Sequence, residues 1–468
     1  MTLRYRIFIG QTKDFVEKYF SSLENDRKIV KYIVMVMLAH VKTLMRQGII
    51  PTSHGEEIVK ILKDLAKSDG ELLYKWIEQS KNSYEDAFEA LEAYLYEFTE
   101  ADAGYIAIGR SRNDHIATVL RLYLRDSIIE TLNTLLDVRE SLLRKATELR
   151  NVIIPFFTHG QVAQCGSAST YFISYEHTLA NIWKLLYQGL DLLRENPLGS
   201  GAASGSIINL DRESAGAMLC LDSSPIPPYY STGSRLFILH YLNTLSLLML
   251  ELSRLAEDMI FLNSLIPNAL KVPVEHIATS SIMPHKRNLV TMETVRANAA
   301  KVCGLAFGAQ SIYKGLPYGY NLDFQEINNV AMQSIDIVQK TLNIIKDFIN
   351  GLSIDENLVQ KYIEDKPCWS SDLVEYIALA SGKPAREVYL NLAKLFKDCG
   401  SIDSVCISKV LSHFNLTLEN IWNMVKNKPV EINIKKMLED AWTRLERDRS
   451  NIKNVSLAIE KCTSILLS

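Results

Sequence analysis

The sequence predicts an all-α protein organised around a bundle of long helices. Residues 114–150 are 37 consecutive positions without glycine or proline, and residues 234–266 form another such run. Within both runs apolar residues recur every three or four positions, which is the spacing of a helix with a buried face. At about 1.5 Å per residue, each helix would be on the order of 50 Å long.

Three further long helices complete the predicted bundle. They are expected at residues 161–193, from 289 to about 303 and beyond, and at 323–350. Apolar residues occupy more than one face of these helices, and one chain alone cannot cover all of those faces. We therefore expect subunits of this protein to bury surface against one another.

Shorter helices are expected on either side of the bundle. The predicted division is an N-terminal helical domain at 1–108, a central five-helix domain at 109–351, and a C-terminal helical domain at 352–468. In the N-terminal domain, apolar residues at helical spacing predict one helix over residues 15–44 and further helices at 58–65 and 85–98.

The overall composition is that of a soluble globular protein. Hydrophobic residues make up 47% and charged residues 22%, and the formal net charge is -3. This balance gives no indication of nucleic acid or of an acidic membrane surface as a partner. No signal peptide is expected, and the most apolar run, residues 236–250, is too short and too polar to span a bilayer.

The seven cysteines are scattered along the chain and show no CxxC spacing. An odd number of dispersed cysteines is typical of reduced thiols in a cytoplasmic protein, which is our expectation here. No spacing typical of metal ligands occurs, so neither a metal nor a cofactor is predicted.

A polar stretch at residues 278–298 is the first candidate for chemistry. It contains Ser280, Lys286 and Arg287, and helical spacing begins at Leu289. The unpaired N–H groups of a helix N-terminus and two nearby cations favour an anion, so a hydroxyl at this point could lose its proton more easily. The alternative is a solvated loop in which a serine caps the helix.

Residues 109–114, Gly-Arg-Ser-Arg-Asn-Asp, are the second candidate. They precede a long helix, and an arginine side chain matches the two oxygens of a carboxylate. Asp114 could instead cap that helix. The glycines of residues 199–205 do not form a dinucleotide fingerprint, because no strand precedes them and their spacing differs. They indicate a backbone that approaches another group closely.

These motifs resemble those of known enzymes. Residues 280–288 resemble the signature loop of the fumarase/aspartase superfamily, although Thr279 and Leu289 replace its usual glycine and proline. Residues 109–114 look like a motif of argininosuccinate lyases. Further matches to that family are residues 158–164, 197–202, 211–213 and 320–326, with departures at His115, Gly160, Cys165 and Asn328.

The resemblance implies an architecture and an activity. The fold would be the three-domain fumarase/aspartase type, with five helices per subunit forming a 20-helix core in a homotetramer. Each active site would be shared between three subunits, which contribute residues 111–113, His159 and residues 280–288. The implied enzyme is a C–N lyase of arginine biosynthesis and the urea cycle that splits argininosuccinate into L-arginine and fumarate without a cofactor.

The resemblance also implies residue roles. Ser280 would be the base, His159 would handle a proton on the opposite face of the substrate, Glu293 would orient that histidine, and Lys286 would stabilise the anionic intermediate. The residues implied to hold the substrate's carboxylates are Arg112, Asn113, Thr158 and Asn288, with Ser111 beside them. Those implied to hold its arginine end are Ser22, Asp26, Tyr320 and Gln325.

Three alternatives remain open at this point. Residues 285–288 read slightly closer to adenylosuccinate lyases. A non-catalytic, crystallin-like homologue would be expected to lose Ser280, His159 or Lys286, and all three are present. His285 competes with Ser280 for the role of base, because the pKa of a histidine is ordinarily nearer neutrality.

Overall fold

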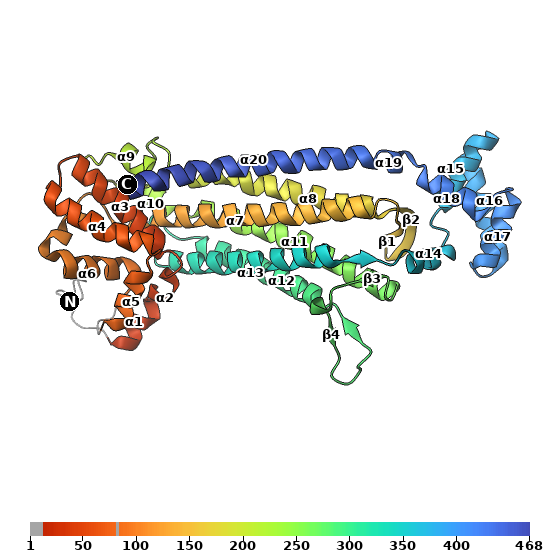
Figure 1. Cartoon of the computed structure of the whole chain (residues 1–468), viewed down its shortest axis with the longest axis horizontal. Coiled ribbons are helices and arrows are strands. Elements are labelled where there is room, and N and C mark those ends of the chain that lie inside the picture. Colours follow the sequence, from red (N-terminus) through yellow and green to blue (C-terminus); the bar gives the residue numbers. More distant parts are fainter. Residues whose placement is uncertain (1–12, 81–83) are drawn as a thin grey trace.

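A computed structural model describes residues 13–80 and 84–468 of the chain. The all-α prediction is confirmed, since the long elements are helices and the strands are short. Figure 1 shows an elongated molecule with the N-terminal helices at one end, long helices through the middle and a group of short C-terminal helices at the other end.

The N-terminal helices form the first of these regions. The expectation of helix throughout residues 15–44 is wrong, because the chain extends at Ser21. There the Ser21 hydroxyl donates to the Glu85 carbonyl oxygen at 2.8 Å. The helices are α1 (Asp14–Phe20), α2 (Leu23–Asp26), α3 (Val30–Arg46), α4 (Thr52–Lys67), α5 (Glu71–Gln79) and α6 (Ala87–Thr99), followed by the 3-10 turn η1 (Glu100–Ala107).

The five predicted long helices are all present. They are α7 (Arg112–Glu148), α8 (Ala168–Gly189), α11 (Leu236–Leu265), α12 (Val290–Tyr313) and α13 (Phe324–Gly351). Successive helices run in opposite directions along the bundle (Figure 1). Short elements connect them: η2 (Leu190–Leu193), α9 (Arg212–Ala217), α10 (Pro228–Gly233) and η3 (Val274–His276).

One boundary in the bundle was predicted wrongly. Residues expected to begin the second long helix form strand β2 (Gln161–Ser167), which pairs with β1 (Ile153–Thr158). His159 and Gly160 connect the strands with φ of 54° and 70°. Positive φ at both central residues is the requirement of a type I′ hairpin turn, and glycine meets it without steric cost.

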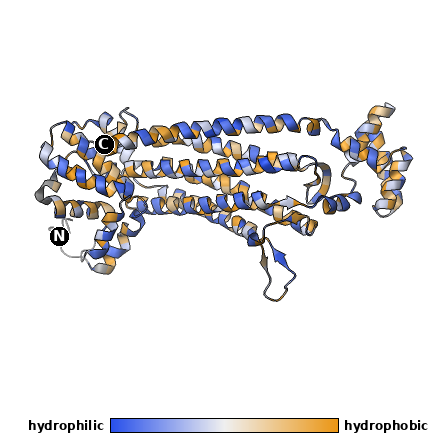
Figure 2. Ribbon diagram, viewed as in Figure 1, coloured by the Kyte–Doolittle hydropathy of each residue, from blue (hydrophilic) through white to orange (hydrophobic). Residues whose placement is uncertain are grey.

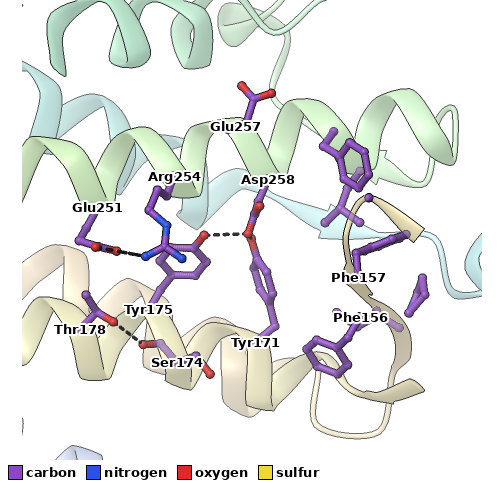
Figure 3. Close-up of a pocket in the computed structure, with 15 residues that line it drawn as sticks. Phe156, Phe157, Tyr171, Ser174, Tyr175, Thr178, Glu251, Arg254, Glu257 and Asp258 are labelled. Atoms are coloured by element: carbon purple, nitrogen blue, oxygen red, sulfur yellow. Dashed lines mark hydrogen bonds and ion pairs between the residues drawn. The ribbon is translucent and has the colours of Figure 1, made fainter. Parts of the chain in front are cut away.

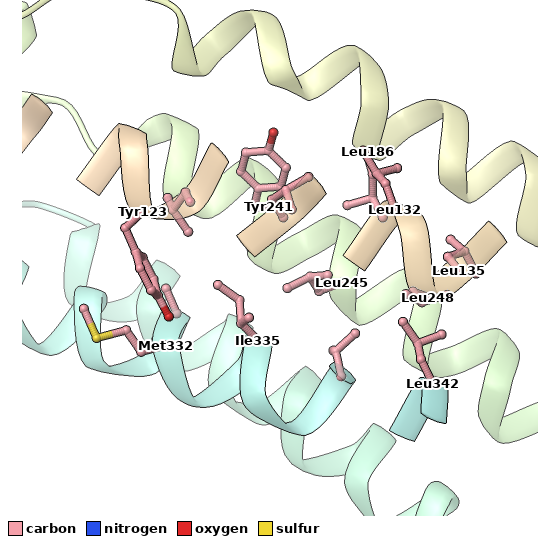
Figure 4. Close-up of a cluster of buried hydrophobic side chains, with 14 of the residues drawn as sticks. Tyr123, Leu132, Leu135, Leu186, Tyr241, Leu245, Leu248, Met332, Ile335 and Leu342 are labelled. Atoms are coloured by element: carbon pink, nitrogen blue, oxygen red, sulfur yellow. The ribbon is translucent and has the colours of Figure 1, made fainter. Parts of the chain in front are cut away.

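Apolar side chains from facing helices fill the middle of the bundle (Figure 4). Leu132 of α7, Leu245 of α11 and Leu342 of α13 are each essentially buried. Burying a leucine side chain contributes about 1.5–3 kcal/mol. The repeated contacts along three helices therefore hold the bundle as one body.

A sixth long helix, α20 (Ile434–Leu467), was not foreseen, because only short helices were expected after residue 351. It runs back along α7 and α8 (Figure 1). Buried Arg139 of α7 joins it to α8, with 2.9 Å ion pairs to both Glu176 and Asp448. Because α20 is polar except for one narrow apolar stripe, its sequence resembles that of an exposed segment.

The short C-terminal helices have an apolar core of their own. Buried Trp369, Leu373 and Ile407 contribute to it, together with Cys165 of β2. The helices are α14 (Glu356–Glu364), α15 (Ser370–Ser381), α16 (Ala385–Cys399), α17 (Ser404–His413), α18 (Leu418–Lys426) and α19 (Pro429–Ile432). The remaining strands are the pairs β3 (Leu270–Lys271) with β6 (Ser353–Ile354) and β4 (Ala278–Thr279) with β5 (Arg287–Asn288).

The expectation of reduced thiols is wrong for six of the seven cysteines. Disulfides join Cys165 to Cys368, Cys220 to Cys462 and Cys399 to Cys406, and Cys303 is free. The first two pairs are 203 and 242 residues apart in the sequence. Only the fold brings such distant residues together, which is why their spacing gave no indication of it.

Helix α11 is long and apolar enough, by length and composition, to cross a membrane. Half of its most apolar window is buried within the chain, and the core helix of a bundle passes the same test. Figure 2 shows hydrophilic residues among the hydrophobic ones along the long helices. By itself, this helix gives only weak support for a membrane span.

Candidate active site

The first group of candidate residues lies where α7 meets the N-terminal helices. Ser111 caps α7: its hydroxyl accepts from the Asn113 N–H at 3.2 Å, and its own N–H donates to Asp114 at 2.9 Å. This reciprocal arrangement is a capping box. Ser111 is therefore the N-cap, and Asp114 completes the capping box from the third helical position and is not itself the cap.

Asp114 also fixes the glycine-rich loop beside this helix. Its second carboxylate oxygen accepts from the Gly201 N–H at 2.9 Å. A Cβ at Gly201 would lie 2.6 Å from the Gly205 carbonyl oxygen, so the loop folds tightly onto itself there. Burial raises the pKa of Asp114 to about 6. Asn113 donates to the Ala202 carbonyl at 3.3 Å, which places it at the edge of the same loop.

Arg112 and Asp26 are each engaged by neighbouring residues. The Arg112 guanidinium forms ion pairs with Asp86 and, at 3.3 Å, with Glu85. Buried Asp26 accepts from the Ser22 hydroxyl and from the Ala87 N–H, both at 3.0 Å. Burial raises the pKa of Asp26 to about 6. The structure thus brings Ser22 and Asp26 into direct contact and puts Arg112 beside the same segment before α6.

Tyr320 and Gln325 lie at the same end of the bundle. Tyr320 belongs to the connection between α12 and α13, Gln325 lies in the first turn of α13, and α13 starts beside the N-terminal helices (Figure 1). The ring of Tyr320 meets that of buried Phe324 edge to face, with 5.9 Å between centroids. Gln325, the next residue along the chain, is half-buried.

Thr158 and His159 lie at the opposite end of the bundle. Both are exposed, at the tip of the β1–β2 hairpin that follows α7. Since α7 has 37 residues, its length separates Arg112 from this hairpin by about 50 Å. His159 of one chain therefore lies far beyond contact distance of the first group.

A cavity of about 480 Å³ opens beside this hairpin, between α8 and α11 (Figure 3). Phe156, Phe157 and Gly160 line the side nearest the hairpin. On its floor, the hydroxyls of Tyr171 and Tyr175 both donate to Asp258, at 3.1 and 2.7 Å. Burial, reinforced by Asp258, raises the pKa of both phenols, so both remain donors.

The third group lies on the β4–β5 hairpin, which projects from the side of the bundle (Figure 1). Residues 281–287, including Lys286, are exposed, and the Ile282 side chain is 84% accessible. The Ser280 hydroxyl accepts from the N–H groups of Met283 at 3.2 Å and Ile282 at 3.4 Å.

The predicted helix start at Leu289 is confirmed, because Leu289 is the N-cap of α12, but Ser280 does not lie at that N-terminus. Helix α12 begins only at Val290, and β5 with Asn288 comes before it. The N–H donors at Ser280 are therefore those of its own turn. Glu293 lies in the first turn of α12 and is exposed.

Sequence reasoning missed a histidine at the base of this hairpin. His276 is 2% exposed, and its two ring nitrogens contact the Thr291 hydroxyl at 2.9 Å and Asp347 at 3.1 Å. It thus joins the entry of the hairpin to α12 and α13. Only its position just before the signature motif could have drawn attention to it.

The candidate residues accordingly form three separate groups within one chain. In the part of the chain that the structure describes, no hydrogen bond or ion pair connects His159 to Ser280, Lys286 or Glu293. Within the same residues, no cluster of three or more acidic, histidine or cysteine side chains suitable for a metal is found.

Comparison with known proteins assigns the family. The family model described as lyase matches residues 8–304. The argininosuccinate lyase of Pyrococcus furiosus is 34% identical over 453 residues, covering 96% of this chain and 97% of its own. That of Sulfolobus acidocaldarius is 38% identical over 388 residues, covering 83% of each chain.

Solved structures agree on the fold. EDDS lyase in complex with formate aligns with a TM-score of 0.80 at 21% identity, covering 94% of this chain and 90% of its own. The class II fumarase of Schistosoma mansoni aligns with a TM-score of 0.69 at 18% identity, covering 86% and 90%. The chain thus belongs to the fumarase/aspartase superfamily and is a C–N lyase. Within that superfamily it is a member of the argininosuccinate lyase family.

Proposed function

We propose that this protein cleaves argininosuccinate into L-arginine and fumarate by anti β-elimination, the last step of arginine biosynthesis. The observation that supports this most strongly is similarity over 96% of the chain to a relative named argininosuccinate lyase. The motifs at residues 109–114 and 320–326 agree with that substrate. Where a urea cycle operates, the same reaction is one of its steps.

Ser280 is the proposed base. As an alkoxide it would take a proton from the carbon next to a substrate carboxylate, and the negative charge would spread onto that carboxylate. Donors directed at such a charge can each change the rate by about 10²–10³. Lys286 and the N–H groups of the Ser280 turn are the proposed donors, and no cofactor or metal is needed for the step.

His159 is proposed to supply the proton that the leaving nitrogen needs when the C–N bond breaks. Glu293 would hold the tautomer of that histidine and stabilise its charged form. The carboxylates of the substrate would be held by residues near the start of α7 and on the two hairpins: Ser111, Arg112, Asn113, Thr158 and Asn288. Its arginine end would be held by Ser22, Asp26, Tyr320 and Gln325.

We propose that the active enzyme is a homotetramer in which three subunits contribute to each site. Reacting groups must approach to about 3–3.5 Å, whereas His159 and Arg112 of one chain are about 50 Å apart. Large apolar side chains are also exposed on the bundle helices, among them Leu250 of α11, Phe307 of α12 and Ile344 of α13. A 20-helix core of four subunits would cover such faces.

Two further parts of the proposal concern organisation and location. We divide the chain into domains at 1–108, 109–351 and 352–468. We also place the enzyme in the cytoplasm, where biosynthesis of amino acids takes place. The cysteines no longer support that location, because disulfides are rare in the cytosol except in hyperthermophiles.

The test is a direct assay of the purified protein with argininosuccinate, with fumarate detected by absorbance. Adenylosuccinate, the substrate that residues 285–288 slightly favour, is run under identical conditions. We expect turnover of argininosuccinate to be the faster of the two. Faster turnover of adenylosuccinate would reassign the substrate, and no turnover of either would favour the non-catalytic, crystallin-like alternative.

A further inference from the structure

Arg235, at the start of α11, is a buried charge that the three groups above do not use. Its side chain is 0% exposed. One terminal nitrogen, Nη1, donates to the carbonyls of Thr232 at 3.2 Å and Ser234 at 2.9 Å. Nε and Nη2 have no partner among the residues that the structure describes. Burying a cation without a carboxylate partner is costly, so its position requires an explanation.

The guanidinium of Arg235 lies over the face of Phe324, with 4.6 Å between Cζ and the ring centroid. Burial lowers the pKa of Arg235 to about 10, so it remains a cation at pH 7 and a cation–π contact is retained. Phe324 is the first residue of α13 and is 1% exposed. The contact with the Arg235 guanidinium therefore helps to fix the position of the Phe324 ring.

Phe324 in turn packs against a side chain that is proposed to bind the substrate. Its ring meets Tyr320 edge to face, at 5.9 Å and 85°, and stacks with Tyr313 at 6.1 Å and 24°. Gln325 follows it directly in α13. The Phe324 ring thus contacts both the buried cation and Tyr320, and Gln325 is its neighbour in the chain, so it adjoins two of the four residues proposed to hold the arginine end.

Helix α10, just before Arg235, also contacts the loop between α12 and α13 that carries Tyr320. A Cβ on Gly233 would lie 2.6 Å from the Gly319 backbone nitrogen, so these two backbones are in direct contact. The Tyr229 hydroxyl donates to the Tyr318 carbonyl oxygen, and their rings are 5.2 Å apart. The two backbones and the two rings fix the segment that ends at Tyr320.

We propose that Arg235 is a positioning residue for argininosuccinate binding, acting through Phe324 to orient Tyr320 and Gln325 toward the arginine end of the substrate. This inference rests on the proposed function, which assigns those two residues to that end. Because the arginine end does not react, the contribution is to binding of the whole substrate more than to the chemical step.

The test compares Arg235→Met, which removes the charge but keeps bulk, with Arg235→Lys, which restores the cation. KM and kcat for argininosuccinate are measured, together with inhibition by L-arginine and by fumarate. Arg235→Met should raise KM about tenfold and change kcat less than about threefold. It should weaken inhibition by arginine and leave inhibition by fumarate near the wild-type value. Arg235→Lys should recover part of the loss.

Gly233→Ala moves the same loop without touching the charge and should change KM and arginine inhibition in the same direction. Gly216→Ala is the control for crowding a short helix, because its Cβ, on α9, would meet the side-chain nitrogen of Asn196 at 2.6 Å, whereas that of Gly233 meets the Gly319 backbone. The Gly216→Ala variant should keep the wild-type KM and the wild-type inhibition by arginine. It also corrects for the general cost of crowding a small helix.

Equal weakening of arginine and fumarate inhibition, or an unchanged KM in Arg235→Met, would overturn the positioning role. If Arg235→Met does not fold, as judged by thermal melting, Gly233→Ala decides by the same criteria.

Equilibrium dialysis with L-arginine separates the positioning role of Arg235 from the proposed function of the enzyme. Lack of argininosuccinate turnover by the wild type refutes the proposed function, whereas arginine binding that is lost in the variants still supports Arg235. Equal arginine binding by wild type and variants, or none by either, refutes the role.

Discussion

Cys165 and Cys368 are joined by a disulfide, with their Cα atoms 5.4 Å apart, and this bond ties the hairpin of His159 to the C-terminal helices. Two hydrogen bonds reinforce it. Gln164 donates to the Ser371 hydroxyl at 3.0 Å, and Lys428 donates to the Cys165 carbonyl at 3.2 Å. The placement of a proposed catalytic histidine thus depends on residues some 200 positions later in the chain.

Replacing both Cys165 and Cys368 with serine should lower both stability and turnover. A disulfide that closes a long loop restricts the unfolded chain and contributes about 2–4 kcal/mol. We expect the melting temperature to fall by roughly 5 °C. We also expect kcat to fall, because the hairpin loses an anchor. Calorimetry and an argininosuccinate assay without reductant measure the two effects.

The matched control is the Cys399→Ser, Cys406→Ser variant, whose disulfide spans a separation of only 7 residues and links α16 to α17 without involving the hairpin strands. It should lose less stability and retain wild-type kcat. An unchanged kcat in the Cys165→Ser, Cys368→Ser variant would disprove the link between this disulfide and His159.

The sequence predicted those parts of the fold that local patterns determine. Uninterrupted helical spacing defined α7 and α11, and Asp114 does take part in capping α7, although Ser111 is the N-cap. The β1–β2 hairpin was missed because residues 161–167 also suit a helix, and the choice depends on the turn at His159 and Gly160. Helix α20 was missed because its narrow apolar stripe can be recognised as a buried face only when α7 and α8 are seen to pack against it.

The sequence motifs nominate residues for the candidate site but do not give their geometry. Motifs identified Ser280, His159 and Arg112, yet their distance within one chain follows from the lengths and directions of the helices. The contacts of His276 and Arg235 were invisible to the sequence, because neither lies in a recognised motif. Both become evident only when elements distant in the chain pack together.

Two buried histidines should make the protein sensitive to acid. His40 and His115 are both 0% exposed, and their rings meet edge to face at 5.1 Å. Burial lowers the pKa of His40 to about 3 and that of His115 well below its ordinary value. Between the unfolded pKa of about 6.5 and these values, the unfolded chain binds more protons. Stability is therefore lost as the pH falls below about 6.5.

Replacing His115 with glutamine, which keeps a polar side chain but does not titrate, should reduce that sensitivity. Relative to wild type, the variant should gain about 1 kcal/mol per pH unit between pH 6 and pH 4. Asp26 and Asp114 act in the opposite direction, because a raised pKa stabilises the fold as the pH falls through about 6. Comparing two proteins that share both aspartates removes their contribution.

Thermal melting across this pH range provides the measurement. His413→Gln, at an exposed position of α17, is the control and should follow the wild-type curve. Parallel curves for wild type and His115→Gln would show that the buried pair does not govern acid stability.

His276→Phe should slow turnover with little effect on overall folding. The change keeps a ring against Phe348 but removes both hydrogen bonds that fix the base of the β4–β5 hairpin. We expect kcat to fall about tenfold, a cost of about 1.4 kcal/mol in the transition state. Thr291→Val removes only one of the two bonds and should have a smaller effect. A wild-type kcat for His276→Phe would show that turnover does not depend on the two hydrogen bonds of His276 at the base of the hairpin.

Mixed subunits should restore activity if sites are shared. His159→Asn and Ser280→Ala subunits are each expected to be inactive, and they are unfolded and refolded together. Random mixing in a tetramer then creates some sites that have both residues intact, so partial activity should return. A monomeric mass in solution, or no recovery after mass spectrometry confirms mixing, would count against the shared site.

Ser280 can act as the base only if neighbouring groups stabilise its alkoxide. A serine hydroxyl is a very weak acid, and α12 begins too late to assist Ser280 directly. The N–H groups of Ile282 and Met283, which already point at its oxygen, are the local donors that would stabilise an alkoxide. Lys286 lies on the same exposed hairpin and could lower the pKa of the serine further once a closed complex excludes water.

His285, on the same hairpin, is the competing base, and substitution separates the two. If Ser280 is the base, Ser280→Ala should lose about 10³-fold or more in kcat while still binding argininosuccinate, since the chemistry and not the binding is removed. His285→Gln should then change little. Single-turnover kinetics with equilibrium binding measures both quantities. If His285→Gln abolishes turnover while Ser280→Ala stays within about tenfold of wild type, or about 1.4 kcal/mol, the assignment of Ser280 is wrong and the histidine is the base.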